Sequence, residues 1–444
     1  MVSSRRVSKY ILRNNKVLII ALMFVLGFLA LGIPKLQISS DNRSFFSGDN
    51  QEYADLKALD ETYSGSNSLL IMIVPPKDTV FSVETLEAMQ RMTADTWQIP
   101  YVLRVDSPIN YTHSYARDDD IIIEPLLDEF DEITKQSAIR FHELAPSLPE
   151  LRNRLLDENQ SAYGLNIQVV LPDNQTTERQ EISNFVHDLV SAWQGDYPDF
   201  EFRLTGVIFG GLTLAKVALD DITTLVPMSL LAVIILFVLL LGSYRAVLIS
   251  LCVIVAATIA TFGYAGWTGV VLTAGTAISP LSVMVLTAGS CVHIILSWLR
   301  GLGVSSGPVT VENALTDNLG AVTVTNVTTA VGFLGLNFAQ SPPLQEMGNI
   351  VAFGLMFGLS ATFIILPYGL LFCGKAKVRR MFFSSSLMNK IAAGVINRHR
   401  FYFVTFVFLI LAAAGGITKI GFDDSIIRYF DDRYEFRRDA DAIQ

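Results

Sequence analysis

The sequence has 444 residues, of which 51% are hydrophobic and 17% charged, whereas charged residues make up about a quarter of an average soluble chain. This composition excludes an ordinary soluble protein, and the formal net charge of −9 argues against a nucleic-acid partner. Seven hydrophobic runs are long enough for a bilayer core of about 30 Å. They cover residues 17–34, 224–242, 246–268, 279–298, 319–339, 347–373 and 401–420.

Basic residues lie on one side of these runs. Residues 1–16 contain five Lys and Arg residues and no acid, and residues 374–400 contain seven and no acid. By the positive-inside rule both segments are cytoplasmic, so we expect a multi-pass membrane protein with a cytoplasmic N-terminus. The first span, residues 17–34, is not followed by an Ala-x-Ala-like cleavage site and is predicted to be an uncleaved signal anchor.

Residues 35–222, between the first two spans, are long enough for a folded extracytoplasmic domain and carry 32 acids against 14 bases. Patterns typical of strand, helix and strand follow one another twice. The expected elements are strand 68–74, helix 82–98 with Ser82 as N-cap, strand 101–106, strand 164–171, helix 176–193 and strand 200–204. Two β-α-β units predict a split, ferredoxin-like α/β sandwich.

The segment between the two units, residues 118–158, is rich in Asp, Glu, Leu and Pro. It predicts helices broken at Pro146 and Pro149, forming a lid or an inserted helical hairpin. The run Asp118-Asp119-Asp120 lacks the alternating ligands and the Gly of an EF-hand, so we interpret it as a solvated turn.

Motifs for catalysis or cofactor binding do not occur in the sequence. It has no nucleophile elbow, phosphate loop, zinc-protease motif or cysteine pair. Cys252, Cys291 and Cys373 all fall within predicted spans, so no disulfide is inferred. We therefore expect neither an enzyme nor a cofactor nor a metal site.

Residues 224–373 predict a bundle of five membrane helices with short turns. The fourth span begins at Ser279-Pro280, because Pro fits the first turn of a helix. His293 is the one titratable side chain in the core of spans two to six. Such a group in a bilayer suggests ion or proton coupling, although a structural hydrogen bond explains a neutral histidine equally well.

The fifth span carries a series of hydroxyl and amide side chains. Thr325, Thr328 and Gly332 share one face, and Asn326 and Thr329 form an adjacent stripe. Small residues also serve helix packing, as expected for Gly289, Gly332, Gly354 and Gly358. Ser290, His293, Thr325, Asn326, Thr328 and Thr329 are the candidates for ion coupling or translocation.

The end of the chain repeats its beginning at an offset of 384 residues. Gly32-Ile33-Pro34-Lys35-Leu36 matches Gly416-Ile417-Thr418-Lys419-Ile420, and the match extends to Phe46 with Phe430 and Asp55 with Asp439. A repeat this long is typical of duplicated half-transporters. We expect a seventh span at 401–420, residues 421–444 as the start of a truncated second outer domain, and a missing C-terminal half as partner.

Several motifs together resemble one family. They are Gly320-Ala321, Thr328-Thr329-x-x-Gly332-Phe333, Pro343-x-x-Glu346-x-Gly348, Leu366-Pro367 and the outer-domain phrase Val105-Asp106-Ser107-Pro108-Ile109-Asn110. The chain is similar to the resistance-nodulation-division superfamily, in particular the MMPL, hydrophobe-amphiphile exporter and sterol-sensing-like branch. The resemblance implies one α/β porter domain and six spans per half, a bacterial inner membrane, and relatives that act as monomers or trimers.

The resemblance also implies proton-driven export of a hydrophobic or amphiphilic substrate. Relatives commonly carry a membrane Asp shortly before the position of His293, where this chain has Gly289, Ser290 and Cys291. Either the missing half supplies the carboxylate, or His293 serves, or another ion or none is used. The alternative functions are a lipid-sensing or scaffolding membrane protein and, more remotely, a protein-export accessory.

Overall fold

The computed structural model divides the chain into two compact units. Residues 1–38 and 217–424 form the first, here named the membrane unit, and residues 39–216 and 425–444 form the second, here named the α/β unit. The structure describes residues 2–39, 46, 51–63, 67–77, 79–117, 120–127, 132–171, 176–302, 307–373, 385–421 and 426–443.

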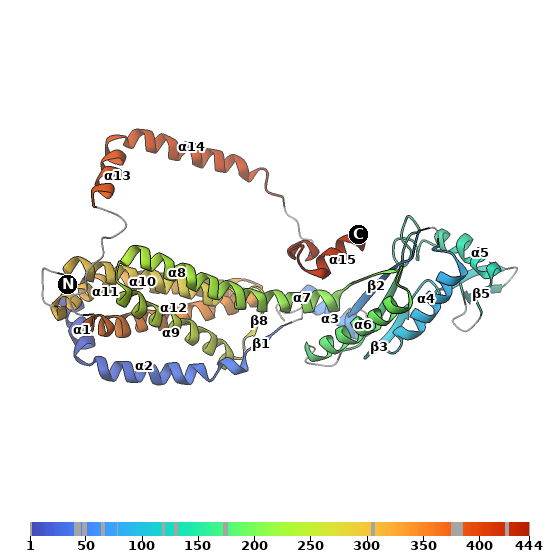
Figure 1. Ribbon diagram of the computed structural model, residues 1–444, viewed down its shortest axis with the longest axis horizontal. Coiled ribbons are helices and arrows are strands. Elements are labelled where there is room, and N and C mark those ends of the chain that lie inside the picture. Colours follow the sequence, from blue (N-terminus) through green and yellow to red (C-terminus); the bar gives the residue numbers. More distant parts are fainter. Residues whose placement is uncertain are drawn as a thin grey trace. The chain divides into compact units, whose positions relative to one another are not determined.

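The α/β unit is built on a four-stranded sheet in the order β3-β6-β2-β7, in which every neighbouring pair is antiparallel. Helix α4 (Val83–Thr96) connects β2 to β3, and α6 (Thr176–Asp196) connects β6 to β7, so two β-α-β units interleave in the sheet (Figure 1). The strands are β2 (Ser68–Val74), β3 (Val102–Asp106), β6 (Tyr163–Val169) and β7 (Glu201–Gly206).

One face of this sheet packs on the helices because apolar residues alternate along the strands. In β2, Leu69, Ile71 and Ile73 are fully buried, and the residues between them are half-buried. The Ser82 side chain accepts a hydrogen bond from the Thr85 N–H, which confirms Ser82 as the N-cap of α4. The opposite face of the sheet, which carries Leu70 and Met72, is here named the open face.

The segment between the two β-α-β units differs from the prediction. A hairpin of β4 (Thr112–Arg117) and β5 (Asp120–Pro125) precedes one helix, α5 (Lys135–Leu144), so the expected helical hairpin is wrong. The β-branched run Ile121-Ile122-Ile123 pairs well with Ser114, Tyr115 and Ala116 across the hairpin, which outweighs the acidic composition. The expected turn at Asp118 and Asp119 lies outside the described residues.

Residues near the C-terminus belong to the same unit as this sheet. Residues 421–444, expected to open a second domain, contribute α15 (Glu435–Ile443), which packs beside the edge strand β7. The Asp439 carboxylate accepts a hydrogen bond from the Leu204 N–H at 3.0 Å and lies 3.5 Å from the Arg203 guanidinium. The helix therefore satisfies a backbone donor that an edge strand otherwise leaves open.

We expect Asp439→Ala to release α15 from β7, because the Leu204 N–H loses its acceptor. Burial raises the pKa of Asp439, although the Leu204 N–H and Arg203 oppose the rise. A raised pKa means that the docked helix binds a proton more tightly than the free one, so docking should strengthen as pH falls through that pKa. Asp439→Asn, an uncharged acceptor, should keep α15 docked.

Amide hydrogen exchange at Leu204, corrected for its intrinsic pH dependence, measures this docking. Loss of the acceptor costs about 1–3 kcal/mol, so exchange in Asp439→Ala should quicken by roughly tenfold or more. Equal exchange in the Ala and Asn variants would show that the carboxylate does not hold the helix.

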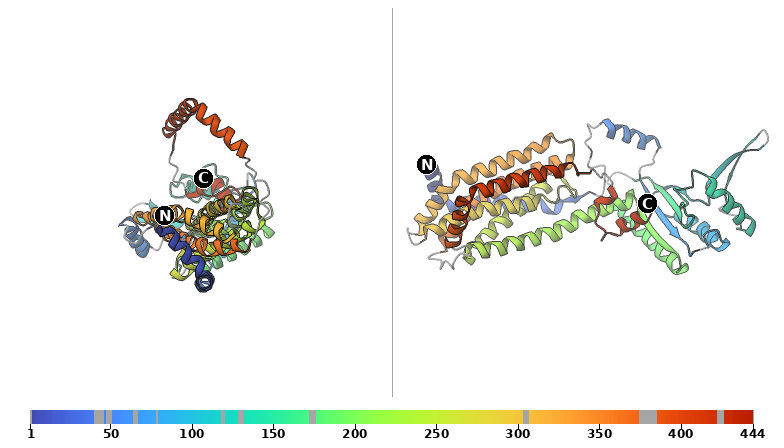
Figure 2. Two further views of the ribbon diagram at one scale, coloured as in Figure 1. Left: turned by 90° about the vertical axis from the view of Figure 1, so that its left-hand side faces the viewer. Right: turned by 90° about the horizontal axis from the view of Figure 1, so that it is seen from above.

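In the membrane unit, the long apolar helices between residues 226 and 371 run side by side (Figures 1 and 2). Seven helices in the described residues are long and apolar enough to cross a membrane. Their spans are Asn15–Lys35, Val207–Leu241, Tyr244–Thr268, Ser279–Gly301, Gly307–Phe338, Pro342–Leu371 and His399–Ile417. The corresponding helices are α2 (Asn15–Ala30), α8 (Val226–Leu241), α9 (Tyr244–Thr268), α10 (Ser279–Gly301), α11 (Gly307–Leu334), α12 (Pro342–Leu371) and α14 (His399–Ile417).

The spans Val207–Leu241 and Gly307–Phe338 begin more than ten residues before the apolar runs that predicted them. Helix α8 continues from α7 (Val207–Asp220) through one π-helical turn. Helix α11 begins twelve residues before the expected 319, and this early part carries Glu312, which pairs with Arg5 of α1 (Val2–Arg13) at 3.3 Å. The predicted spans were too short because they were taken from apolar runs. A helix can continue beyond the bilayer in polar turns, which such a run does not include.

Helices α2 and α9 approach each other through glycines. A Cβ on Gly266 would lie 1.9 Å from the Gly32 carbonyl oxygen, and one on Gly263 would lie 2.1 Å from that of Leu29. Trp267 stacks on Phe28 with ring centroids 4.8 Å apart. Only residues without a side chain allow two membrane helices to come this close.

The backbone repeats at the same offset as the sequence. The Asn14 N–H donates to the Tyr10 carbonyl at 3.0 Å where α1 ends, and the Arg398 N–H donates to Gly394 at 3.0 Å where α13 (Ser385–Asn397) ends. The Lys35 N–H donates to the Gly32 carbonyl at 2.9 Å, and the Lys419 N–H donates to the Gly416 carbonyl at 3.0 Å, so the two turns match. The two segments therefore share local structure. Residues 374–384 of the expected basic linker lie outside the described residues.

The remaining elements are short. They are α3 (Gln51–Tyr63) in the α/β unit, and β1 (Gln37–Ile38) paired in parallel with β8 (Val271–Leu272) in the membrane unit.

Candidate functional site

A cavity of about 240 Å³ lies between α10 and α11. Eleven residues line it, ten from these two helices and Leu355 from α12. Pro280 in the first turn fixes where α10 begins, and this start sets which side chains of α10 face α11. Five of the six coupling or translocation candidates line the cavity, namely Ser290, His293, Thr325, Asn326 and Thr329.

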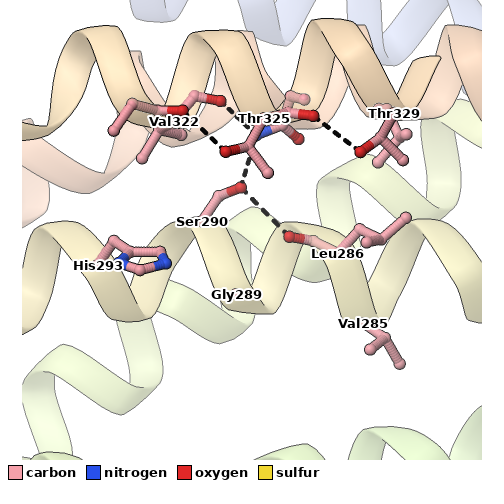
Figure 3. A pocket seen from close by; sticks show the side chains of 11 residues that line it. Val285, Leu286, Gly289, Ser290, His293, Val322, Thr325 and Thr329 are labelled. Carbon is pink, nitrogen blue, oxygen red and sulfur yellow. Dashed lines mark hydrogen bonds between the residues drawn. The ribbon is translucent and has the colours of Figure 1, made fainter. Parts of the chain in front are cut away.

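An amide–hydroxyl pair joins the two helices across the cavity. The Asn326 amide is buried and donates to the Ser290 hydroxyl at 2.8 Å and to the Val322 carbonyl at 2.8 Å. Ser290 points from α10 toward α11 and donates in turn to the Leu286 carbonyl at 3.2 Å (Figure 3). Asn326 therefore has the partner that an amide inside a membrane requires.

The threonines of α11 hydrogen-bond to their own helix. Thr325 donates to the Ala321 carbonyl at 2.9 Å, and Thr329 donates to the Thr325 carbonyl at 2.8 Å (Figure 3). Thr328 bonds to the Val324 carbonyl at 2.8 Å and does not line the cavity. Hydroxyls satisfied in this way leave only their lone pairs for a substrate, an ion or water.

His293 lies on α10 beside the cavity with its ring exposed (Figure 3). In the part of the chain that the structure describes, the ring forms no hydrogen bond, so the structural hydrogen bond that the sequence suggested is not present there. The imidazole is also the one titratable side chain among the eleven lining residues, none of which is a carboxylate.

The four glycines predicted to pack helices fall into two groups. A Cβ on Gly354 would lie 2.4 Å from Thr261 Oγ1, and one on Gly358 would lie 2.5 Å from Thr287 Oγ1, so α12 packs closely on α9 and α10 there. A Cβ on Gly289 or Gly332 would meet no described atom within 4 Å. For these two the structure corrects the expected packing role, because both lie on an open part of the helix surface.

The structure adds residues that the sequence did not indicate. Val285, Leu286, Ala321, Val322 and Leu355 line the cavity, but an apolar residue in a membrane helix gives no signal in the sequence. The hydroxyl of Thr287 is buried without a hydrogen-bond partner among the described residues. Thr287 packs against Gly358 and thus places a buried polar group without a partner about one helical turn from Ser290.

The lining of the cavity is mostly apolar, and its polar members include no lysine, arginine or carboxylate. An amide and hydroxyls can bind a hydroxyl, a carbonyl or water, but they cannot take up and release a proton near neutral pH. Within the lining, only the His293 imidazole could do so. Among the described residues, no cluster of histidine, cysteine or carboxylate side chains could hold a metal ion.

Comparisons with known proteins agree with this membrane architecture. The model of the MMPL family matches residues 82–385, which cover the cavity and most of both units. A comparison with curated proteins returned no match.

Proposed function

This chain belongs to the MMPL family, and from that membership we propose that it exports a lipid-like, hydrophobic or amphiphilic molecule across a membrane with the energy of an ion gradient. The family match, which spans strands β3, β6 and β7 of the sheet and the apolar helices α8 to α12, carries the proposal. The seven apolar helices make it a multi-pass membrane protein. The proposal includes no catalytic reaction.

In this proposal the α/β unit is an extracytoplasmic porter domain of ferredoxin-like topology that receives the amphiphile. The sheet order β3-β6-β2-β7 supports it, because two interleaved β-α-β units produce that order. The basic residues of 1–16 and 374–400 support a cytoplasmic N-terminus, and the family resemblance supports a bacterial inner membrane.

The cavity between α10 and α11 would connect ion movement to helix movement. Polar groups in a membrane interior cost free energy and are retained where they line a pathway or a moving contact. The Asn326–Ser290 hydrogen bond joins α11 to α10 at the cavity, so a shift of α10 along α11 must break it. In this proposal Asn326 forms the contact that breaks when the helices move, and His293 is the candidate for carrying a proton.

We expect Asn326→Leu to reduce transport by roughly tenfold, the effect of losing one interhelical hydrogen bond worth about 1–2 kcal/mol. Folding should be retained, because Ser290 keeps its bond to Leu286 and the leucine side chain has the same branched shape as that of asparagine. The measurement is movement of a fluorescent lipid analogue in proteoliposomes under an imposed pH or sodium gradient. Thr328→Val, on the same helix but outside the cavity, is the matched control.

His293→Gln in the same liposomes tests the coupling. Loss of the response to a pH gradient assigns the coupled proton to His293, and an unchanged response places it elsewhere. If the protein moves no lipid analogue under any ion gradient, the transport proposal fails. A lipid-sensing role would then be the next function to test.

A further inference from the structure

A second and larger cavity lies in the α/β unit. Its volume is about 660 Å³, and Leu70, Met72 and Gly164 of the open face of the sheet line it together with residues 153–159 and 161–163. Ala442 and Ile443, at the end of α15, line it as well. Every lining residue belongs to the α/β unit.

The wall of this cavity is a folded loop with many internal contacts. Leu151 and Leu156 are buried in the core, and the Gly164 N–H bonds to the Leu155 carbonyl at 2.8 Å. A Cβ on Gly164 would already lie 3.3 Å from the Arg154 carbonyl oxygen, so the loop closely covers the open face of the sheet. A wall held in this way is formed before a ligand arrives, which lowers the cost of binding.

Two acidic residues at the rim already have hydrogen-bonding partners. The Asp157 carboxylate accepts bonds from the Asn159 N–H at 3.2 Å and from the Ser161 hydroxyl at 2.6 Å. Glu158 pairs with Arg152 at 3.3 Å.

Arg154, by contrast, lines the cavity without a partner for its guanidinium in the described part of the chain. Of the charged side chains in the lining, Arg154 is thus the one that forms no hydrogen bond or ion pair with a described residue.

The floor of the cavity is apolar. Leu70 and Met72 are only half-buried, and Ile443 at the end of α15 is half-buried beside them. An alkyl chain that removes these side chains from water would gain about 25 cal/mol for each Å² of apolar surface buried. The cavity thus combines an apolar floor with a single positive charge at its rim.

From this combination we infer that the cavity binds a single-chain amphiphile with an anionic head group, the alkyl chain on Leu70 and Met72 and the carboxylate or phosphate on Arg154. The inference rests on the proposed function, since it names the substrate class that the α/β unit receives. Planar guanidinium groups bind carboxylate and phosphate with two parallel hydrogen bonds. Arg154 is the one cation in a lining that also carries Asp157 and Glu158, so the cavity offers a single position for an anionic head group.

Photoaffinity labelling of the full chain in nanodiscs tests the inference. Three probes share one diazirine-bearing alkyl chain and carry a carboxylate, a phosphate or a neutral hydroxyl head group. We expect the carboxylate probe, the phosphate probe or both to label peptides containing residues 151–164. Arg154→Gln should lower that labelling by about tenfold, the loss of one charge-assisted bond, while weak labelling by the hydroxyl probe stays unchanged.

Arg91→Gln in α4 is the matched control, because it removes the same charge from an exposed arginine of the α/β unit that does not line the cavity. It should leave labelling unchanged. Equal labelling by charged and neutral probes, or equal losses in the two arginine variants, would overturn the inference. Labelling without transport contradicts the proposed function alone, whereas transport of an anionic amphiphile without labelling at 151–164 contradicts this inference alone. Whichever anionic probe labels more strongly identifies the head group.

Discussion

Replacing Gly266 with alanine is expected to destabilise the membrane unit by about 3 kcal/mol, the upper end of the usual cost of overpacking. The new Cβ would lie 1.9 Å from the carbonyl oxygen of Gly32 and 2.6 Å from its carbonyl carbon. Both are backbone atoms, so no side-chain rotation relieves the clash and α2 must move away from α9. Trp267 would then lose its hydrogen bond to the Phe28 carbonyl, now 2.9 Å long, and its stacking on the Phe28 ring.

Thermal unfolding of the purified protein in detergent measures this loss. Gly289→Ala is the matched control, since it makes the same substitution within a membrane helix where no described atom lies within 4 Å of the new Cβ. Alanine also favours a helix over glycine, so this variant should be as stable as the parent protein or slightly more stable. Equal stability of the two variants would show that the contact of Gly32 with Gly266 does not hold α2 to α9.

Replacing Gly206 with alanine should destabilise the α/β unit by about 3 kcal/mol, through backbone strain and a steric clash together. Gly206 has φ of +110°, a region that residues with a side chain rarely adopt. A Cβ there would also lie 2.7 Å from the Leu69 Cα and 2.8 Å from the Ser68 carbonyl oxygen. The pairing of β7 with β2 must therefore open where β7 leads into α7.

Hydrogen exchange of the β2 and β7 amides resolves this effect from changes in the membrane unit. Protection should fall across both strands in Gly206→Ala. Gly195→Ala in α6, where the new Cβ meets no described atom, should instead stabilise the unit by about 0.5–1 kcal/mol. Protection that stays at the parental level in Gly206→Ala would mean that the edge of the sheet accommodates a side chain at this position.

The strands and helices of the two β-α-β units could be predicted from local patterns. Strand 68–74 was predicted at the bounds that β2 has, because its alternating burial follows from alternating side-chain directions. The prediction of a helical hairpin for residues 118–158 was wrong. It relied on the acidic composition of the segment and gave no weight to the β-branched run of β5, which pairs with β4. Pairing of this kind depends on the neighbouring strand and not on composition alone.

The candidate site was predictable only in its polar members. Asn326 and His293 attract attention in any membrane helix, because polar groups are costly there. The partner of Asn326 was not predictable, since Ser290 lies 36 residues away on another helix. The sequence also could not separate Gly354 and Gly358, which pack closely, from Gly289 and Gly332, which do not, because all four belong to the same kind of pattern.

The sequence by itself determined which segments cross the membrane and that residues near both ends share one motif. The first depends only on the length of an apolar run, and the second only on which residues recur at a fixed offset along the sequence. Only the tertiary structure decided which side chains meet. The contact of Asp439 with Leu204 joins residues 235 positions apart, and the cavity beside Arg154 forms only where a loop covers the open face of the sheet. Such contacts result from packing between elements, whose geometry local propensity does not specify.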